Sequence, residues 1–480
     1  MLFNSLHFLL FFIFTTLAYY SLPKRGRWVL LLLASCYFYM AFIPVYLLIL
    51  GLVILIDYVA GLYIERSEGP RRRLLLIVSI IANIGLLAFF KYYDFFHVQI
   101  TAFLATLGLT HSVPMLGDLI PGIVLPIGLS FHTFQSISYT IEVYRGNQKA
   151  EHNLGVYALY VLFYPQLVAG PIERPQNILP QFHAFQPFDW TRVRYGLLLM
   201  AGGFVKKVVI ADRMALVVDP AFRHIDTSNG STLLLAAVFY SIQIYCDFSG
   251  YTDIAIGAGQ VLGIRMMKNF DTPYLSASIA EFWRRWHISL SSWFRDYVYI
   301  PLGGNRGTTA RTYLNTLMVF GLSGLWHGAD WKFIIWGALH GVYLIIGQML
   351  SRRRRKTGAM AEVEQSQVRG LAIHRGNQLL TFGLVTLTWV FFRAASTSDA
   401  LVVLGKILTV DLSAPVQTAI SVAELAFCAL LIAGLLLEPR WIAFTKRATN
   451  GQFWFVFIML ALFCYFFGVF TANQFIYFQF

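Results

Sequence analysis

The feature that most constrains this chain is a long series of apolar segments, most of them close to twenty residues in length. A helix of about 20 apolar residues can cross the hydrocarbon core of a bilayer, and it satisfies its own backbone hydrogen bonds there. The sequence therefore predicts an all-α, polytopic membrane protein. The candidate spans lie near residues 5–22, 28–44, 45–64, 74–93, 118–140, 154–172, 194–218, 232–262, 330–350, 377–392, 419–438 and 453–471.

The balance of apolar and charged residues excludes a soluble protein. Hydrophobic residues make up 57% of the chain and charged residues 13%, whereas a soluble domain carries about 25% charged residues. A net charge of +13 would suggest nucleic-acid binding in a soluble protein. Here the basic residues cluster beside apolar segments, as in cytoplasmic membrane loops, without a basic-aromatic pattern for base stacking. We expect membrane lipid around the chain and no nucleic-acid partner.

The region between residues 262 and 326 departs from the pattern of full spans. Segments near 279–298 and 312–326 are too charged or too short to cross a membrane alone. Backbone at membrane depth that does not span must be buried in protein or line a cavity. We therefore expect re-entrant or partly inserted helices here. No repeat of fixed period is visible, so residues 1–480 are predicted to form one domain.

Basic clusters in the connecting loops predict the orientation of the chain. Short loops rich in Lys and Arg remain in the cytoplasm, and these loops follow the first, third and two later spans. Both termini would then lie on the outer, periplasmic side. The basic residues are Lys24, Arg25, Arg27, Arg66, Arg71, Arg72, Arg73, the run 352–356, Arg440, Lys446 and Arg447.

Two carboxylates interrupt the apolar segment near residues 232–262. Asp247 and Asp253 lie in the stretch Gln243–Asp253, and a charged side chain at mid-helix costs about 2.5–3.5 kcal/mol on insertion scales. Such residues face a cavity or a partner. Functional carboxylates and carboxylates that merely pair with basic residues on neighbouring helices both remain open.

A basic and aromatic segment follows at residues 278–301. Ser278 and Glu281 have the spacing of a capping box, which predicts a helix start. Trp283 and His287 are four residues apart and are expected to share one face of that helix. The segment suits a cavity for a phosphorylated ligand near the cytoplasmic surface. The alternative is an interfacial helix that binds anionic lipid headgroups.

His327 lies between apolar runs in the block Ser323–Gly341. A lone membrane histidine often makes only a structural hydrogen bond, so both roles remain open. His340 is thirteen residues further on and would lie on another face of a continuous helix. Histidine spacings typical of zinc sites and the Gly-x-Ser-x-Gly nucleophile motif are absent. We expect no metal site.

These blocks, in this order, resemble those of the membrane-bound O-acyltransferase (MBOAT) family. Two earlier blocks, Leu125–Tyr139 and Tyr164–Arg174, belong to the same pattern. The likeness extends over roughly residues 1–345, with a motif-rich core at about 120–345. Its most similar branch comprises the membrane subunits of bacterial alginate O-acetyltransferases, and the stretch Ile300–Gly307 fits that branch.

The resemblance implies a ring or funnel of about 10–13 helices with re-entrant segments around the active site. It also implies two catalytic histidines, because His327 matches the signature histidine of the family and His287 matches a position occupied by His or Asn. Acyl transfer needs a base for the attacking hydroxyl or a group that takes the acyl chain, and a neutral imidazole can serve.

The implied activity is O-acetyl transfer in the bacterial inner membrane. Acetyl-CoA would be the donor substrate, with no other cofactor, and its phosphates would favour arginines. The acceptor would be an alginate-like exopolysaccharide, reached through a periplasmic partner with a Ser-His-Asp site. The candidate phosphate-binding residues are Arg284, Arg285, Arg295 and Arg306.

Two other functions remain open at this point. One is D-alanyl transfer to polymers of the teichoic acid type, since the D-alanyl transferases share the blocks around His287 and His327. The other is a proton-coupled transporter that uses Asp247, Asp253 and His327. A transporter would be expected to show repeated halves, and the sequence shows none.

Overall fold

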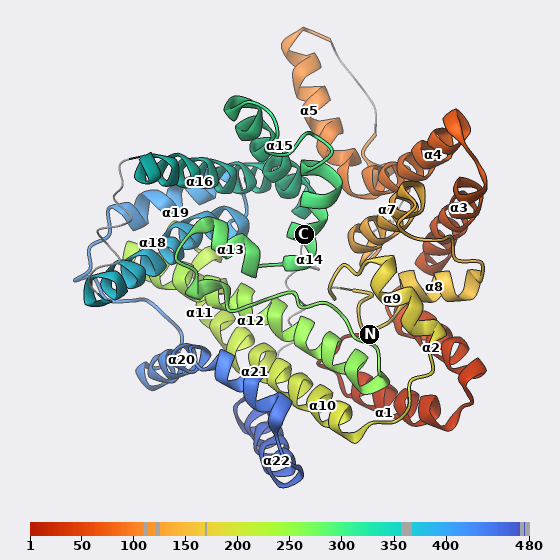
Figure 1. Ribbon diagram of the computed structural model, residues 1–480. Coiled ribbons are helices and arrows are strands. Elements are labelled where there is room, and N and C mark those ends of the chain that lie inside the picture. Colours follow the sequence, from red (N-terminus) through yellow and green to blue (C-terminus); the bar gives the residue numbers. More distant parts are fainter. Residues whose placement is uncertain (110–113, 121–124, 169, 357–366, 471–474, 476–480) are drawn as a thin grey trace. The chain divides into compact units, whose positions relative to one another are not determined.

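The protein is described from a computed structural model of residues 1–480, apart from residues 110–113, 121–124, 169, 357–366, 471–474 and 476–480. The described residues form helices and loops, with no strand among them (Figure 1). This confirms the predicted all-α class. The chain forms two compact units. Unit 1 comprises Met1–Leu197 and Ile254–Met267, and unit 2 comprises Leu198–Asp253 and Lys268–Phe480.

Unit 1 contains the N-terminal apolar helices, the beginning of α10 and the end of α12 (Gly230–Leu262) from Ile254 onwards. Its elements are α1 (Leu6–Ser21), α2 (Lys24–Met40), α3 (Tyr46–Arg66), α4 (Gly69–Leu87), the π-helical η1 (Ala88–Tyr92), α5 (Tyr93–Thr106), α6 (Leu116–Leu119), α7 (Leu129–Arg145), α8 (Leu154–Leu162), α9 (Pro175–His183) and the first part of α10 (Trp190–Phe204).

Unit 2 contains the rest of α10, most of the longest helix, and every motif that the sequence marks after residue 262. Its elements are the π-helical η2 (Val205–Ala211), α11 (Asp212–Arg223), α12 (Gly230–Leu262) as far as Asp253, the short η3 (Pro273–Leu275), α13 (Ile279–Arg285), α14 (Ile288–Phe294), the π-helical η4 (Arg295–Tyr299), α15 (Thr309–His327), α16 (Trp331–Lys356), α18 (Gln367–Arg393), α19 (Thr397–Leu408), α20 (Val422–Leu435), α21 (Glu438–Arg447) and α22 (Asn450–Phe467).

Several of these helices can cross a bilayer. Within the described residues, five are long and apolar enough, and α20 with α21, bent by 60° at their junction, could make a sixth span. The protein is therefore a multi-pass membrane protein. The five are Tyr46–Arg66, Gly69–Thr106, Gly230–Leu262, Trp331–Arg353 and Asn450–Phe467.

Two of the predicted spans are not single helices. In the segment 118–140, helix α7 begins only after Gly128, which has a left-handed backbone (φ 78°). In the segment 154–172, helix α8 ends at Leu162 and the described residues that follow form turns. Pro165 lacks the backbone N–H that an uninterrupted helix would need there. Both predictions were wrong because mean hydropathy does not register such breaks.

A buried polar cluster holds α3, α4 and α7 together in unit 1. The Asp57 carboxylate accepts hydrogen bonds from Ser79 Oγ at 2.6 Å and from Asn83 Nδ2 at 2.9 Å. Ser79 Oγ also lies 3.1 Å from Thr140 Oγ1 on α7. The carboxylate therefore has several donors, as a buried acid requires.

In unit 2, α15 and α16 form a hairpin whose helices approach closely at two glycines. A Cβ atom at Gly324 would lie 2.2 Å from the Phe333 carbonyl oxygen, and one at Gly337 would lie 2.1 Å from the Phe320 carbonyl oxygen. Only glycine fits at both positions, as at other close helix crossings in membranes. The hairpin turn separates His327, at the end of α15, from the helix that carries His340.

Adjacent lysines on η2 meet the two carboxylates that the sequence places inside α12. Lys206 Nζ lies 2.7 Å from Asp253 Oδ2 and also binds Glu438 of α21. Lys207 Nζ lies 2.6 Å from Asp247 Oδ1. Of the two interpretations left open for these aspartates, the structure favours ion pairing with basic residues of neighbouring elements.

Candidate active site

The segment that carries His287 is broken into short helices. Ser278 Oγ accepts the Glu281 N–H at 3.1 Å, which confirms the predicted helix start. The first helix, α13, already ends at Arg285, and His287 has a left-handed backbone with φ 43° and ψ 54°. The prediction that Trp283 and His287 share one helical face is therefore wrong, because the helix ends between them.

His287 is wholly buried in an aromatic pocket of unit 2. Its ring centroid lies 4.7 Å from that of Phe248 on α12, 6.4 Å from Phe270 and 6.3 Å from Trp326 on α15. Burial lowers the pKa of His287 to about 3. The imidazole is therefore neutral at pH 7, which is the state that can accept a proton or a hydrogen bond.

His327 is the last residue of α15, and it too is buried. Its ring centroid lies 4.9 Å from Trp326, 5.0 Å from Trp336 on α16 and 5.4 Å from Phe392 on α18. All three contacts are tilted or edge-on, with interplanar angles of 72° or more. Three rings from three helices thus fix the plane of the imidazole.

The two candidate histidines share one neighbour. The Trp326 ring contacts both the His327 ring and the His287 ring. Residues forty positions apart in the sequence are therefore brought to the same place by α14 and α15. The structure brings both predicted histidines into one buried cluster.

His340 belongs to the same aromatic cluster, although the sequence suggested a separate face. Its ring lies 5.1 Å from Trp336, which also contacts His327. Trp283 Nε1 donates to His340 Nδ1 at 3.2 Å, and His340 Nε2 lies 2.9 Å from Thr388 Oγ1. Both ring nitrogens are used, as in a structural histidine. The prediction assumed one continuous helix, whereas the chain turns between α15 and α16.

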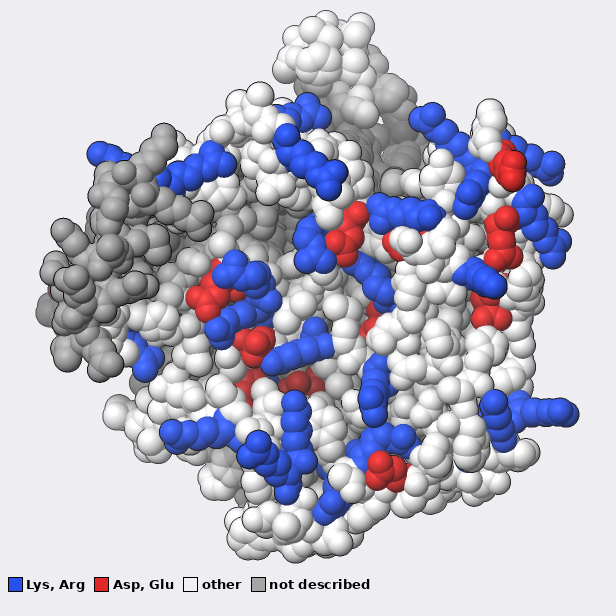
Figure 2. All heavy atoms as spheres, viewed as in Figure 1, with Lys and Arg blue, Asp and Glu red and all other residues white. Residues whose placement is uncertain are grey.

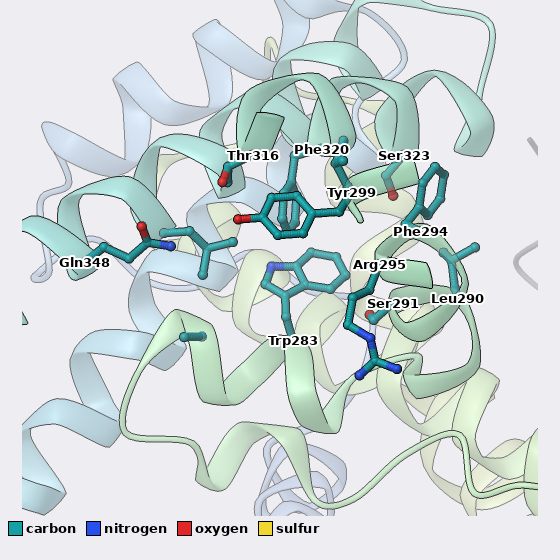
Figure 3. Close-up of a pocket in the computed structure, with 13 residues that line it drawn as sticks. Trp283, Leu290, Ser291, Phe294, Arg295, Tyr299, Thr316, Phe320, Ser323 and Gln348 are labelled. Carbon is teal, nitrogen blue, oxygen red and sulfur yellow. The ribbon is translucent and has the colours of Figure 1, made fainter. Parts of the chain in front are cut away.

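A cavity of about 410 Å³ lies beside this cluster, between α13, α14, η4, α15 and α16. Its wall is mainly apolar. In Figure 3 the rings of Trp283 and Tyr299 lie near the centre of the view, with Gln348 and Arg295 on opposite sides. Ser323, one helical turn before His327, also lines it. Neither candidate histidine is among the residues that line this cavity.

The four predicted phosphate-binding arginines do not form one cluster. Arg295 lines the cavity and pairs with Asp296 at 2.8 Å. Arg285 Nη2 lies 2.7 Å from Glu281 Oε1. Arg284 and Arg306 have exposed side chains, away from the cavity lining. The sequence could not show that these arginines lie apart, because the breaks between the short helices are not visible in it.

Comparison with known proteins decides the family. Residues 147–369 match the family model of membrane-bound O-acyltransferases. The chain is 41% identical over 406 residues to a probable alginate O-acetylase of Azotobacter vinelandii, a match that covers 83% of this chain and 76% of that protein. The chain belongs to the MBOAT family.

Two further relatives show how widely the likeness extends. A peptidoglycan O-acetyltransferase of Helicobacter pylori is 37% identical over 401 residues, which cover 78% of this chain and 72% of that protein. A teichoic acid D-alanyltransferase of Streptococcus thermophilus is 30% identical over 293 residues, which cover 55% of this chain and 68% of that protein. The protein is an O-acyltransferase.

The buried cluster around His287 and His327 contains residues that the sequence did not single out as part of a site. Trp326 and Trp336 contact the candidate histidines, and Asn269 Oδ1 lies 3.2 Å from His287 Nδ1. Trp326 directly precedes His327, and this position in the sequence could have indicated that it belongs to the site. Nothing in the sequence around Asn269 connects it to a histidine eighteen residues later.

Proposed function

We propose that this acyltransferase moves an acetyl group from cytoplasmic acetyl-CoA towards an exported, alginate-like polysaccharide. The observation that carries the proposal is the pair of buried histidines that both contact Trp326, beside a cavity of substrate size. The names of the relatives support acetyl as the group and a cell-envelope polysaccharide as the acceptor. A periplasmic Ser-His-Asp acetyltransferase would complete the transfer to the polymer.

In this proposal His327 is the catalytic base. It takes the proton of the acceptor hydroxyl as the oxygen attacks the acetyl carbon, the C–S bond breaks, and the coenzyme leaves as a thiolate that is then protonated. A positioned general base contributes about 10²–10⁴-fold to such a step. His287 holds a second polar group of the substrates by a hydrogen bond.

The cavity would hold the pantetheine arm of the donor. Its volume of about 410 Å³ falls within the range of about 300–1,000 Å³ common for small-molecule sites. The apolar wall suits a narrow arm with few charges. Arg295, at one side, supplies the guanidinium that a phosphate of the coenzyme would need.

We expect Arg295→Glu to weaken acetyl-CoA binding about 10-fold or more. A hydrogen bond to a charged group contributes about 1.5–3 kcal/mol, and 1.4 kcal/mol corresponds to a tenfold change in Kd. The measurement is calorimetric titration of the purified protein in detergent. Arg223→Glu, at an exposed position on α11, is the control and should bind normally. Equal affinities for the two variants would place the phosphates elsewhere.

The proposed location is the bacterial inner membrane, with both termini in the periplasm. Figure 2 shows Lys and Arg side chains at many places on the surface, and basic loops remain in the cytoplasm. Such loops would also attract a polyanionic donor from that side.

Cysteine labelling tests this orientation. In a background without the four native cysteines, Arg71→Cys and Arg352→Cys should resist an impermeant thiol reagent in intact cells and react after lysis. Ser413→Cys, exposed in the loop between α19 and α20, should react in intact cells. The reverse pattern would invert the topology and place the donor site on the other side.

The alternatives have less support. The D-alanyl transferase relative aligns with 55% of this chain, against 83% for the probable alginate O-acetylase. A proton-coupled transporter would use Asp247 and Asp253, but both aspartates pair with lysines of η2.

A further inference from the structure

Asn269 is a wholly buried amide that contacts both the backbone and the side chains around His287. Its Oδ1 lies 3.2 Å from His287 Nδ1 and accepts hydrogen bonds from Ser289 Oγ at 2.9 Å and the Ser289 backbone N–H at 3.2 Å. Its own carbonyl oxygen accepts the Ile288 N–H at 2.9 Å. One residue thus fixes the chain directly after His287 as well as the imidazole.

These contacts determine which nitrogen of His287 carries the proton. A backbone N–H can only donate, so the atom of Asn269 that faces Ser289 must be the amide oxygen and not the amide nitrogen. That oxygen can only accept, so His287 Nδ1 must be the donor. In the neutral imidazole the lone pair is then on Nε2.

The backbone of His287 needs this support. Its φ of 43° and ψ of 54° lie in the left-handed region, which is strained for a non-glycine residue and persists only when the surroundings enforce it. The hydrogen bond from Ile288 to Asn269 and the start of α14, where the Ser291 N–H donates to the His287 carbonyl at 2.9 Å, enforce it here.

We propose that Asn269 is the positioning residue of His287, and that it makes Nε2 a hydrogen-bond acceptor for the hydroxyl group of the acyl acceptor. This inference rests on the proposed function and makes it more specific. An acceptor nitrogen cannot stabilise the acyl carbonyl oxygen, because that oxygen also only accepts. Of the groups that His287 could hold, the tautomer selects the O–H of the acyl acceptor.

Other titratable groups lie near His287 and are connected to it through a shared aromatic ring. His327 shares the Trp326 ring with it, and Tyr245 shares the Phe270 ring. Phe248, Phe270 and Trp326, which are in ring contact with His287, carry no titratable group. Ser289 Oγ also lies 3.5 Å from His287 Nδ1, but it donates its proton to Asn269 Oδ1. The shorter contact of Nδ1 with Asn269 therefore sets the tautomer.

Nitrogen NMR of the full-length protein labelled with ¹⁵N-histidine tests the tautomer directly. The His287 signals are identified by their loss in His287→Gln. We expect a protonated Nδ1 and an unprotonated Nε2 at neutral pH. An Nε2–H tautomer in the unaltered protein would overturn the proposal, whether or not any Asn269 variant folds. Asn315→Leu, which removes another wholly buried amide of unit 2, should leave these signals unchanged.

Enzyme kinetics then test the role. Asn269→Leu should lower kcat about 10²-fold, the effect expected when a reacting group is misplaced by about 1 Å, while acetyl-CoA affinity stays unchanged. Asn269→Asp should recover much of the activity, because a carboxylate accepts the same three hydrogen bonds. Weaker acetyl-CoA binding by Asn269→Leu would overturn the assignment to the acceptor hydroxyl.

His287→Ala separates this proposal from the proposed function. If His287→Ala retains full activity, the role of His287 in the proposed function fails, and the role of Asn269 fails with it. If His287→Ala is inactive while folded Asn269→Leu is fully active, only the positioning role is overturned.

Discussion

His327→Ala should lose polymer acetylation by about 10²-fold or more, the lower part of the range for removing a general base. The structure also predicts a cost in stability, because the imidazole packs against Trp326, Trp336 and Phe392. His327→Gln is therefore the more informative variant. It fills most of the same volume and keeps polar atoms, but it cannot take up a proton at neutral pH.

The measurement is acetate release from the polymer of cells that produce each variant, scaled to the amount of protein in the membrane. His340 is unsuitable as a control, since it shares Trp336 with His327 and binds Trp283 and Thr388. His224, exposed after α11, is the better choice, and His224→Ala should be fully active. Normal acetylation by folded His327→Gln would disprove the role of His327 as a base.

The fold class was predictable because it depends on segment length and apolar content, which the bilayer tests directly. Segments such as Tyr46–Arg66 and Asn450–Phe467 span on those grounds alone. The breaks were harder to predict. The end of α8 at Leu162 and the break before α7 depend on prolines and a glycine inside apolar stretches, and window averages conceal them.

The two histidines could be singled out from the sequence, but not their arrangement. His287 adopts a left-handed backbone that few non-glycine residues adopt, and it does so because Asn269 and the aromatic rings surround it. Local sequence patterns predicted a continuous helix there. Contacts that arise only in the folded chain outweighed the local preference of this segment for a continuous helix.

The partners of Asp247 and Asp253 were within reach of sequence reasoning. Lys206 and Lys207 lie in the middle of the predicted span 194–218. Buried charges in a membrane must be paired. Two lysines in one span and two aspartates in another are therefore expected to form ion pairs. A requirement of charge balance between predicted spans would have found these pairs.

Lys206, like Lys207, pairs with two carboxylates, and its loss should be severe. It binds Asp253 and Glu438, and Tyr245 donates a hydrogen bond to Glu438. All four side chains lie in unit 2, and Lys206 and Glu438 are buried. One lysine therefore faces two carboxylates, and without it the two negative charges would lose the cation that they share.

We expect Lys206→Met to destabilise the folded protein by about 3–5 kcal/mol, the usual cost of removing one partner of a buried ion pair. Thermal unfolding in detergent measures it. Lys268→Met is the matched control, because Lys268 pairs with Asp271 on the surface, with both side chains about half exposed, and such pairs contribute about 0–1 kcal/mol. Combining Lys206→Met with Asp253→Asn and Glu438→Gln removes the uncompensated charges, and it should restore much of the lost stability. If the triple variant were no more stable than Lys206→Met, the loss would come from packing around the lysine and not from charge.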